Sequence, residues 1–216
     1  MKTKKMVKKD VEFYSQLAIV FVLFGILMYS LGSGATINIS GGATHTSDIL
    51  PTGLPDVYGN ELRISYDDVS PSNPQLADQT ISIMSNIDRS ETLEGDDLVR
   101  YIDILYNMHN GMSCEYCCGA RSIIFDTGEP ACGCAHSYAM RGLTKYLILN
   151  HGDEFTDEEI LIEVGKWKVL FFPGIHEVKA QALEDNGIEF NYINLASNLY
   201  RGIEEGQGSG GMVGGC

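Results

Sequence analysis

An uncharged apolar run, FYSQLAIVFVLFGILMYSL, occupies residues 13–31 and divides the chain into two chemically different parts. As an α-helix these 19 residues would extend about 28 Å, close to the thickness of the hydrocarbon core of a bilayer. All five lysines of residues 1–12 precede the run, and this asymmetry places the lysine-rich side in the cytoplasm. The sequence therefore predicts a basic cytoplasmic tail at 1–12, a single transmembrane helix at 13–31 that contacts the lipid bilayer, and an extracytoplasmic domain.

A cleaved signal peptide is the alternative explanation of this run, because small residues follow it at Ser33, Gly34 and Ala35. The apolar core of a signal peptide usually has about 7–15 residues, which is shorter than the run found here. The length therefore favours an uncleaved anchor in the cell membrane. Either outcome leaves the rest of the chain outside the cytoplasm.

The charge beyond the anchor is strongly acidic. When the five lysines and two acids of residues 1–31 are subtracted from the totals of 15 and 29, residues 32–216 carry 10 basic and 27 acidic side chains, or −17. A polyanion is bound by clustered lysines and arginines, so this balance excludes nucleic acid as a partner. The remaining partners are the bilayer, through residues 13–31, and another extracytoplasmic protein.

The extracytoplasmic part is predicted to consist of three segments. Residues 32–47, the linker, are small and polar and show no core-forming pattern. Residues 48–205 have the length of one domain. Residues 206–216 contain six glycines and predict a flexible tail that cannot pack. The tail ends in Cys216, which we expect to be a mobile thiol that reaches a partner or the other cysteines, a free end, or a link between two chains.

The hydrophobic pattern of residues 48–205 predicts a mainly α-helical domain with a few short strands. Five helices are expected. The first begins near Pro74, the second spans about 95–109, and the third runs from Cys134 to about 150. The fourth begins at a Thr156–Glu159 capping box and stops at Pro173, and the fifth spans about 175–186. Short strands are expected from alternating apolar residues at 62–66 and 188–192, and from the segment SIIFD at 122–126.

Five of the six cysteines lie between positions 114 and 134, and this clustering is the strongest chemical signal in the sequence. A hairpin turn at 126–130 would bring a C-x-x-C turn next to a cysteine pair at a helix start. The candidate metal ligands are Cys114, Cys117, Cys118, Cys132, Cys134 and His136.

Thiolates bind metal ions, and the N-terminus of a helix stabilises the anion. Four thiolates suit Zn²⁺ in tetrahedral geometry, and they also suit the softer Cu(I). Additional sulfur and imidazole groups close in sequence shift the prediction slightly toward copper; these are Met108, His109, Met112, His136 and Met140.

Two other uses of the cysteines remain open. In an oxidising compartment they could form structural disulfides that join Cys114 and Cys118 to Cys132 and Cys134. They could also exchange disulfides with other proteins, as C-x-x-C motifs do when one thiol has a lowered pKa. The sequence has no Ser-His-Asp signature, phosphate loop or dinucleotide fingerprint, so an enzymatic role is the less favoured interpretation.

The order of a cysteine turn, a hairpin and a cysteine pair at a helix start, over residues 112–140, resembles a treble-clef zinc site, with C-x-C in place of the second C-x-x-C. The following segment, MRGLTKYLILNHGDEFTDEEILIEVGKWKVLFFPG, is similar to the helical hairpin of cytochrome c maturation thiol reductases. It also resembles the helical segment of PCYCGC-type copper-binding proteins, whose cysteine motif precedes such a hairpin as Cys132-Gly133-Cys134 does here. The first resemblance implies a zinc site, the second implies thiol chemistry, and the third implies copper binding.

Together these features predict a membrane-anchored, extracytoplasmic protein with a small helical domain, in which metal or disulfides staple a hairpin. The expected function is acquisition, sensing or delivery of Cu(I) or Zn²⁺. The alternatives are a membrane-tethered thiol–disulfide oxidoreductase or maturation factor, and a surface module with purely structural disulfides.

Overall fold

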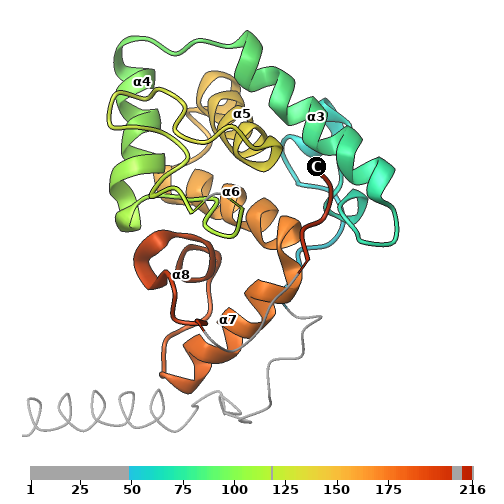
Figure 1. The fold of residues 1–216 in the computed structure, drawn as a ribbon. Helices are drawn as coiled ribbons and strands as arrows, with labels where there is room; N and C mark the ends of the chain where they lie inside the picture. The colour runs from blue at the N-terminus through green and yellow to red at the C-terminus, as the bar shows by residue number, and fades with distance from the viewer. Residues whose placement is uncertain (1–48, 118, 206–210, 216) are drawn as a thin grey trace, which may run out of the picture. The chain divides into compact units, whose positions relative to one another are not determined.

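The computed structural model describes residues 49–117, 119–205 and 211–215, all within one compact unit that spans 43–216 (Figure 1). The predicted anchor at 13–31, the basic tail before it and the whole linker after it lie outside the described residues. Within the described ranges no helix is both long enough and apolar enough to cross a membrane.

The described part of the chain is mainly α-helical, as predicted. Its α-helices are α2 Gly59–Leu62, α3 Pro74–Ser90, α4 Gly95–Ile102, α5 Ala135–His151, α6 Asp157–Phe171, α7 Pro173–Asp185 and α8 Tyr192–Ala196. Shorter turns are the 3-10 helices η2 Tyr66–Asp68, η4 Met108–Asn110 and η5 Asn198–Tyr200, and the π-helix η3 Asp103–Asn107.

Local sequence signals set several helix ends. The hydroxyl of Thr156 accepts a hydrogen bond from the Glu159 N–H, while the Glu159 carboxylate accepts one from the Thr156 N–H, which is the predicted capping box. The proline at 173 both follows the end of α6 and occupies the first turn of α7, where its missing N–H is not needed. These predicted boundaries are confirmed.

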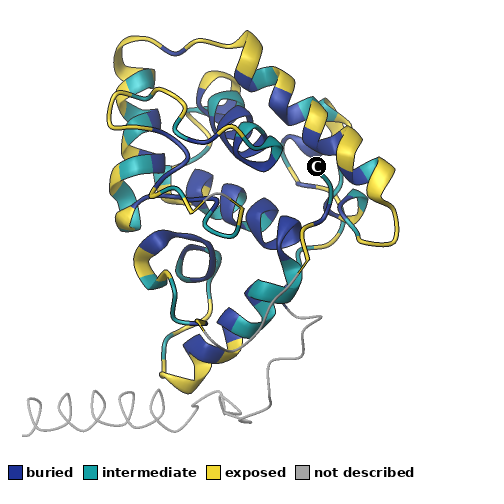
Figure 2. Ribbon diagram, in the orientation of Figure 1, coloured by how far each residue is buried: buried dark blue, intermediate teal, exposed yellow. Residues whose placement is uncertain are grey.

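Helix α5 is central to the fold and packs against α3, α4 and α6 (Figure 1). Its closest approach is to α3 at Gly142, where a Cβ atom would lie 1.9 Å from the carbonyl oxygen of Met84. Only glycine allows the two backbones to come so near. The faces that meet here and along α6 are buried (Figure 2), and Trp167 on α6 is fully covered.

The predicted strands at 62–66 and 188–192 are wrong. Ile64 and Tyr66 are both buried, but Ser65 between them caps η2 instead of pairing with another strand. Asn191 likewise caps α8, since its side chain accepts a hydrogen bond from the N–H of Asn194. At 62–66 the sequence alternation corresponds to alternating burial in an irregular segment, which the period alone does not distinguish from a strand. At 188–192 burial does not alternate, since Phe190 is exposed.

The hairpin around residues 126–130 forms, although its arms are too short to be strands. The N–H of Phe125 donates to the Glu129 carbonyl at 2.8 Å, and the N–H of Ala131 donates to the Ile123 carbonyl at 3.1 Å. In the described residues, β-pairing is limited to isolated bridges at Ile124–Pro130 and Met112–Ser197. The expectation of a few short strands is therefore corrected to one hairpin turn without a sheet.

The glycine-rich C-terminal segment packs against the domain at residues 211–215, which we call the C-terminal strap. Val213 is 3% exposed, and its N–H donates to the Phe171 carbonyl at 2.9 Å. The prediction of a tail that cannot pack is wrong here, because a single apolar side chain with backbone hydrogen bonds holds the glycines. Residues 206–210 and Cys216 lie outside the described residues.

Candidate metal centre

The first ligand loop begins at the π-helix η3, which ends the α4 segment. The carbonyl of Leu105 in η3 accepts the N–H of Met112 at 2.9 Å and the hydroxyl of Ser122 at 3.0 Å. A π-turn shifts the regular helical hydrogen bonds, and such turns are frequent at functional sites. The one carbonyl thereby anchors both ends of the segment that carries Cys114.

Asn198 holds the same loop from the other side. Its side-chain nitrogen donates to the carbonyls of Asn110 at 2.9 Å and Arg121 at 2.7 Å, and its oxygen accepts a hydrogen bond from Ser113. All the hydrogen-bonding atoms of this buried amide are used to fix a loop that has no regular structure of its own.

A buried ionic cluster fixes the residue after Cys114. The Glu115 carboxylate, 5% exposed, lies 3.3 Å from Lys168, 3.6 Å from Lys179 and 3.3 Å from Arg201. Burial alone would raise the pKa of Glu115, but the two lysines outweigh it and lower this pKa. Burial lowers the pKa of Lys168 to about 8. The loop is therefore tied by charge to α6 and α7.

The second pair of cysteines is fixed by helix α5. Cys134 is the N-cap of α5, and its sulfur accepts the N–H of Ser137 at 3.4 Å and lies 3.2 Å from the Ser137 hydroxyl. Further along α5, Arg141 donates to the Cys132 carbonyl at 2.8 Å. The helix thus determines the positions of both cysteines of the C-x-C motif.

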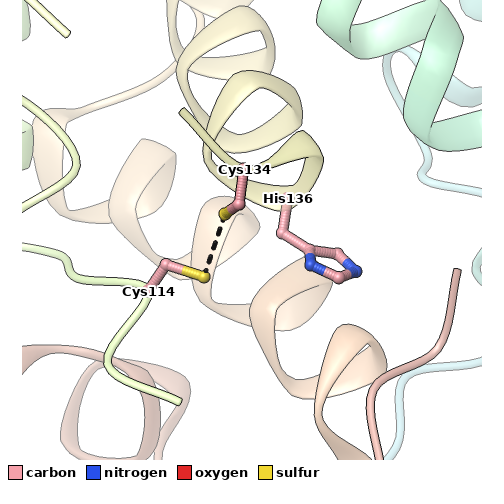
Figure 3. A group of neighbouring side chains, drawn as sticks. All are labelled: Cys114, Cys134 and His136. Atoms are coloured by element: carbon pink, nitrogen blue, oxygen red, sulfur yellow. Dashed lines mark hydrogen bonds between the residues drawn. The ribbon is translucent and has the colours of Figure 1, made fainter. Parts of the chain in front are cut away.

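The two segments bring their sulfurs together (Figure 3). The Sγ atoms of Cys114 and Cys134 are 3.3 Å apart, and those of Cys132 and Cys134 are 3.6 Å apart. The donor atoms of Cys114, Cys134 and His136 all lie within 4.8 Å of one another. These S–S distances exceed the bond length of a disulfide, about 2.05 Å, and are close to the roughly 3.8 Å between thiolates on one tetrahedral zinc ion.

The two contacting thiols differ in acidity. The hydrogen bonds with Cys114 and Ser137 lower the pKa of Cys134 and outweigh burial, which would raise it. The same sulfur–sulfur contact, with burial, raises the pKa of Cys114. The proton of the Cys114–Cys134 hydrogen bond is thus shared by the two sulfurs, and the lower pKa belongs to the sulfur at the helix N-terminus, as expected from the helix dipole.

The His136 ring lies in the first turn of α5 and is fully buried. It packs between the rings of Phe171 at 4.8 Å and Phe172 at 5.0 Å between centroids. Its Nε2 lies 3.0 Å from the carbonyl oxygen of Val213, whereas its Nδ1 has no hydrogen-bond partner among the described residues. A buried polar atom of this kind is a candidate ligand atom.

The structure brings Cys114, Cys132, Cys134 and His136 of the predicted ligand set together. The side chain of Cys117 is exposed, one turn beyond Cys114, and its N–H donates to the Cys114 carbonyl at 3.2 Å. Cys118 lies outside the described residues.

Of the residues that shifted the prediction toward copper, His136 lies at the site, and the other four have other surroundings. Met112 and Met140 are fully buried members of the hydrophobic core, and Met108 packs against that core. His109 lies 3.9 Å from Glu158. The preference for copper over zinc therefore has no support from these side chains.

Sequence reasoning missed the residues that hold the site in place. Of these, Lys168 gave a signal, because it follows Trp167 within an apolar helix and a lysine there needs a buried partner. Asn198 and Val213 gave none, since their roles depend on contacts with segments more than 70 residues away in the chain.

No protein-family model, curated protein or solved structure matches the chain. The resemblances to treble-clef sites, thiol reductases and PCYCGC-type proteins therefore stay predictions.

Proposed function

We propose that this chain is a membrane-anchored, extracytoplasmic protein that binds Cu(I) or Zn²⁺ through Cys114, Cys132, Cys134 and His136. One observation carries the proposal: two thiols and the unpartnered nitrogen of a buried imidazole converge within 4.8 Å of one another. Three cysteines and one histidine form a recognised zinc ligand set, and the same sulfurs suit Cu(I).

The electrostatics of the site favour a cation. The pKa of Cys134 is lowered, so this thiol gives up its proton to a metal ion more readily than an ordinary thiol does. A bound metal ion would also displace the shared proton and supply the missing partner of His136 Nδ1. An unsatisfied buried polar group costs about 1–3 kcal/mol, so binding would relieve an existing penalty.

The accessibility of the sulfurs supports acquisition or delivery rather than a sealed structural site. Cys114 and Cys132 are buried, but Cys134 is half-buried and Cys117 is exposed. A thiol from a partner protein could therefore approach the Cys134 side while the buried cysteines keep hold of the ion. The anchor at 13–31 and the charge of −17 in residues 32–216 support a place at the outer membrane surface.

The experiment is metal analysis of the full chain, purified in detergent under anaerobic conditions, with a parallel thiol count. We expect one equivalent of zinc or copper per chain. Cys114→Ser and Cys134→Ser should each lose the ion, whereas the matched variant Cys117→Ser should keep it. Stoichiometric disulfides without metal would contradict the proposal, and loss of the ion in Cys117→Ser would contradict the ligand set.

A thiol–disulfide oxidoreductase is the second candidate, favoured by the lowered pKa of Cys134 at a helix N-terminus. In this reaction the Cys134 thiolate would attack a disulfide of a partner protein and release one partner thiolate. A second cysteine thiolate, from Cys132 or Cys114, would then attack the mixed disulfide, so that the domain is oxidised and the partner reduced. Trapping of a mixed disulfide at Cys134 in a Cys132→Ala, Cys114→Ala double variant would favour this candidate over metal binding.

A further inference from the structure

The C-terminal strap, residues 211–215, lies directly on the side of His136 that faces away from the cysteines. Three described helices hold it. The Val213 N–H donates to the Phe171 carbonyl of α6, and the Val213 carbonyl contacts His136 of α5. The Gly215 N–H donates to the Asp78 carboxylate of α3 at 2.7 Å. In Figure 1 the strap, coloured dark red, runs beside α3. The strap therefore has a defined path over the site.

The contact with Val213 determines which nitrogen of His136 carries the proton. A backbone carbonyl can only accept a hydrogen bond, so Nε2, at 3.0 Å, must be the donor. A neutral imidazole has one N–H, and Nδ1 is then left with a lone pair. Nδ1 has no hydrogen-bond partner among the described residues, and the ring lies beside the sulfurs of Cys114 and Cys134 (Figure 3).

The strap is shaped to lie flat on the imidazole. Gly215 has φ +80°, a left-handed conformation that favours glycine, and a Cβ atom there would lie 2.9 Å from His136 Nε2. Gly211, at the start of the strap, has open space around it. Gly214, at φ +67° and with a Cβ that would lie 2.8 Å from Ile81, also requires glycine, but it is Gly215 that touches the ring.

We propose that the C-terminal strap is the outer-shell partner of the metal site, and that the Val213 carbonyl fixes His136 in the tautomer that offers Nδ1 as a ligand. The role of the strap in metal binding rests on the proposed function, whereas the contact between Val213 and His136 does not. It replaces the expectation of a flexible transfer arm, because the strap holds a ligand in place instead of carrying the ion away. Outer-shell partners of histidine ligands typically change metal affinity by roughly 10–100-fold.

The first test uses the metal-free full chain with ¹⁵N-labelled histidine. NMR should show that His136 is protonated at Nε2 and unprotonated at Nδ1. Protonation at Nδ1, or an even mixture of tautomers, would overturn the proposal. This measurement needs no variant and no metal, so it stands even if the protein proves not to bind a metal ion.

The second test compares Gly215→Ala with the matched control Gly211→Ala. The first should displace the strap, abolish the tautomer preference and weaken binding of Zn²⁺ or Cu(I) by roughly 10–100-fold in competition with a chelator. The control Gly211→Ala should leave the tautomer preference and the metal affinity unchanged. Equal affinity of Gly215→Ala and the native chain, with an altered tautomer, would overturn the role of the strap in metal binding.

A failure of the proposed function can be distinguished from a failure of the strap proposal. If the native chain binds neither metal while His136 shows the expected tautomer, the proposed function is wrong and the strap geometry is right. If the chain binds metal with the other tautomer, the function stands and the role of the strap is wrong. Circular dichroism of Gly215→Ala checks that the helices are retained.

Discussion

Replacing Arg141 with methionine tests how the hairpin is held against the central helix. The Arg141 side chain is fully buried, and its Nε and Nη2 atoms both lie 2.9 Å from the Asp88 carboxylate. Its Nη1 donates to the carbonyls of Ile123 at 3.2 Å and Cys132 at 2.8 Å. One guanidinium thus joins α3, α5 and both arms of the hairpin.

The expected loss of stability follows from the buried groups that the substitution leaves without a partner. Removing one partner of a buried ion pair costs about 3–5 kcal/mol. Lys145 stays 2.8 Å from Asp88 and still compensates part of the Asp88 charge. The Ile123 and Cys132 carbonyls, however, lose a hydrogen-bond donor. We therefore expect Arg141→Met to lower the free energy of unfolding by about 4 kcal/mol.

Trp167 gives the assay, because it is the only tryptophan in the sequence and is fully buried. Its fluorescence during urea titration of the full chain in detergent should show a lower midpoint for Arg141→Met. The double variant Asp88→Leu, Arg141→Met should recover much of the loss, since it removes both buried charges. A loss below about 1 kcal/mol in the single variant, or purely additive losses in the double variant, would refute this reasoning.

Three further predictions concern other parts of the chain. Gly142→Ala should lower the free energy of unfolding by about 3 kcal/mol or more, because its Cβ would meet a backbone carbonyl of α3 at 1.9 Å. The control Gly133→Ala, at a position with open space, should leave stability unchanged, and thermal unfolding compares the two variants. Burial opposes protonation of His151, but hydrogen bonds to Glu154 and Glu61 raise its pKa. Its contribution to stability should therefore be complete below a pH of about 6.5 and lost as the pH rises through the raised value, and His151→Gln should flatten this dependence in urea titrations at several pH values. Protease added to intact cells should cut the linker, and full protection of the linker would contradict the extracytoplasmic location.

The helices and the site were predictable where the signal is local in sequence. The capping box of Thr156, the proline at 173 and the cysteine pair at the start of α5 each act within one or two helical turns. The convergence of Cys114 with Cys134 followed from one predicted turn, which the hairpin hydrogen bonds confirm.

The remaining features depend on contacts that sequence periodicity does not encode. Ile64 and Tyr66 alternate with Ser65 as a strand would, yet the buried side chains belong to a capped turn. The strap was predicted to be flexible because glycine opposes order, and the packing of Val213 and the hydrogen bonds of Val213 and Gly215 reverse that expectation. The partners of Glu115 lie on helices far along the chain, so neither lysine could be assigned to it beforehand.

The π-turn at Asp103–Asn107 links the length of the α4 segment to the cysteine site. A π-turn accommodates one residue more than an α-turn, so deleting a residue there would restore a regular helix. The Leu105 carbonyl would then bond within the helix and lose Met112 and Ser122, the two anchors of the Cys114 loop. In related chains, this single-residue insertion and the cysteines should therefore be inherited as a unit, each present only where the other is.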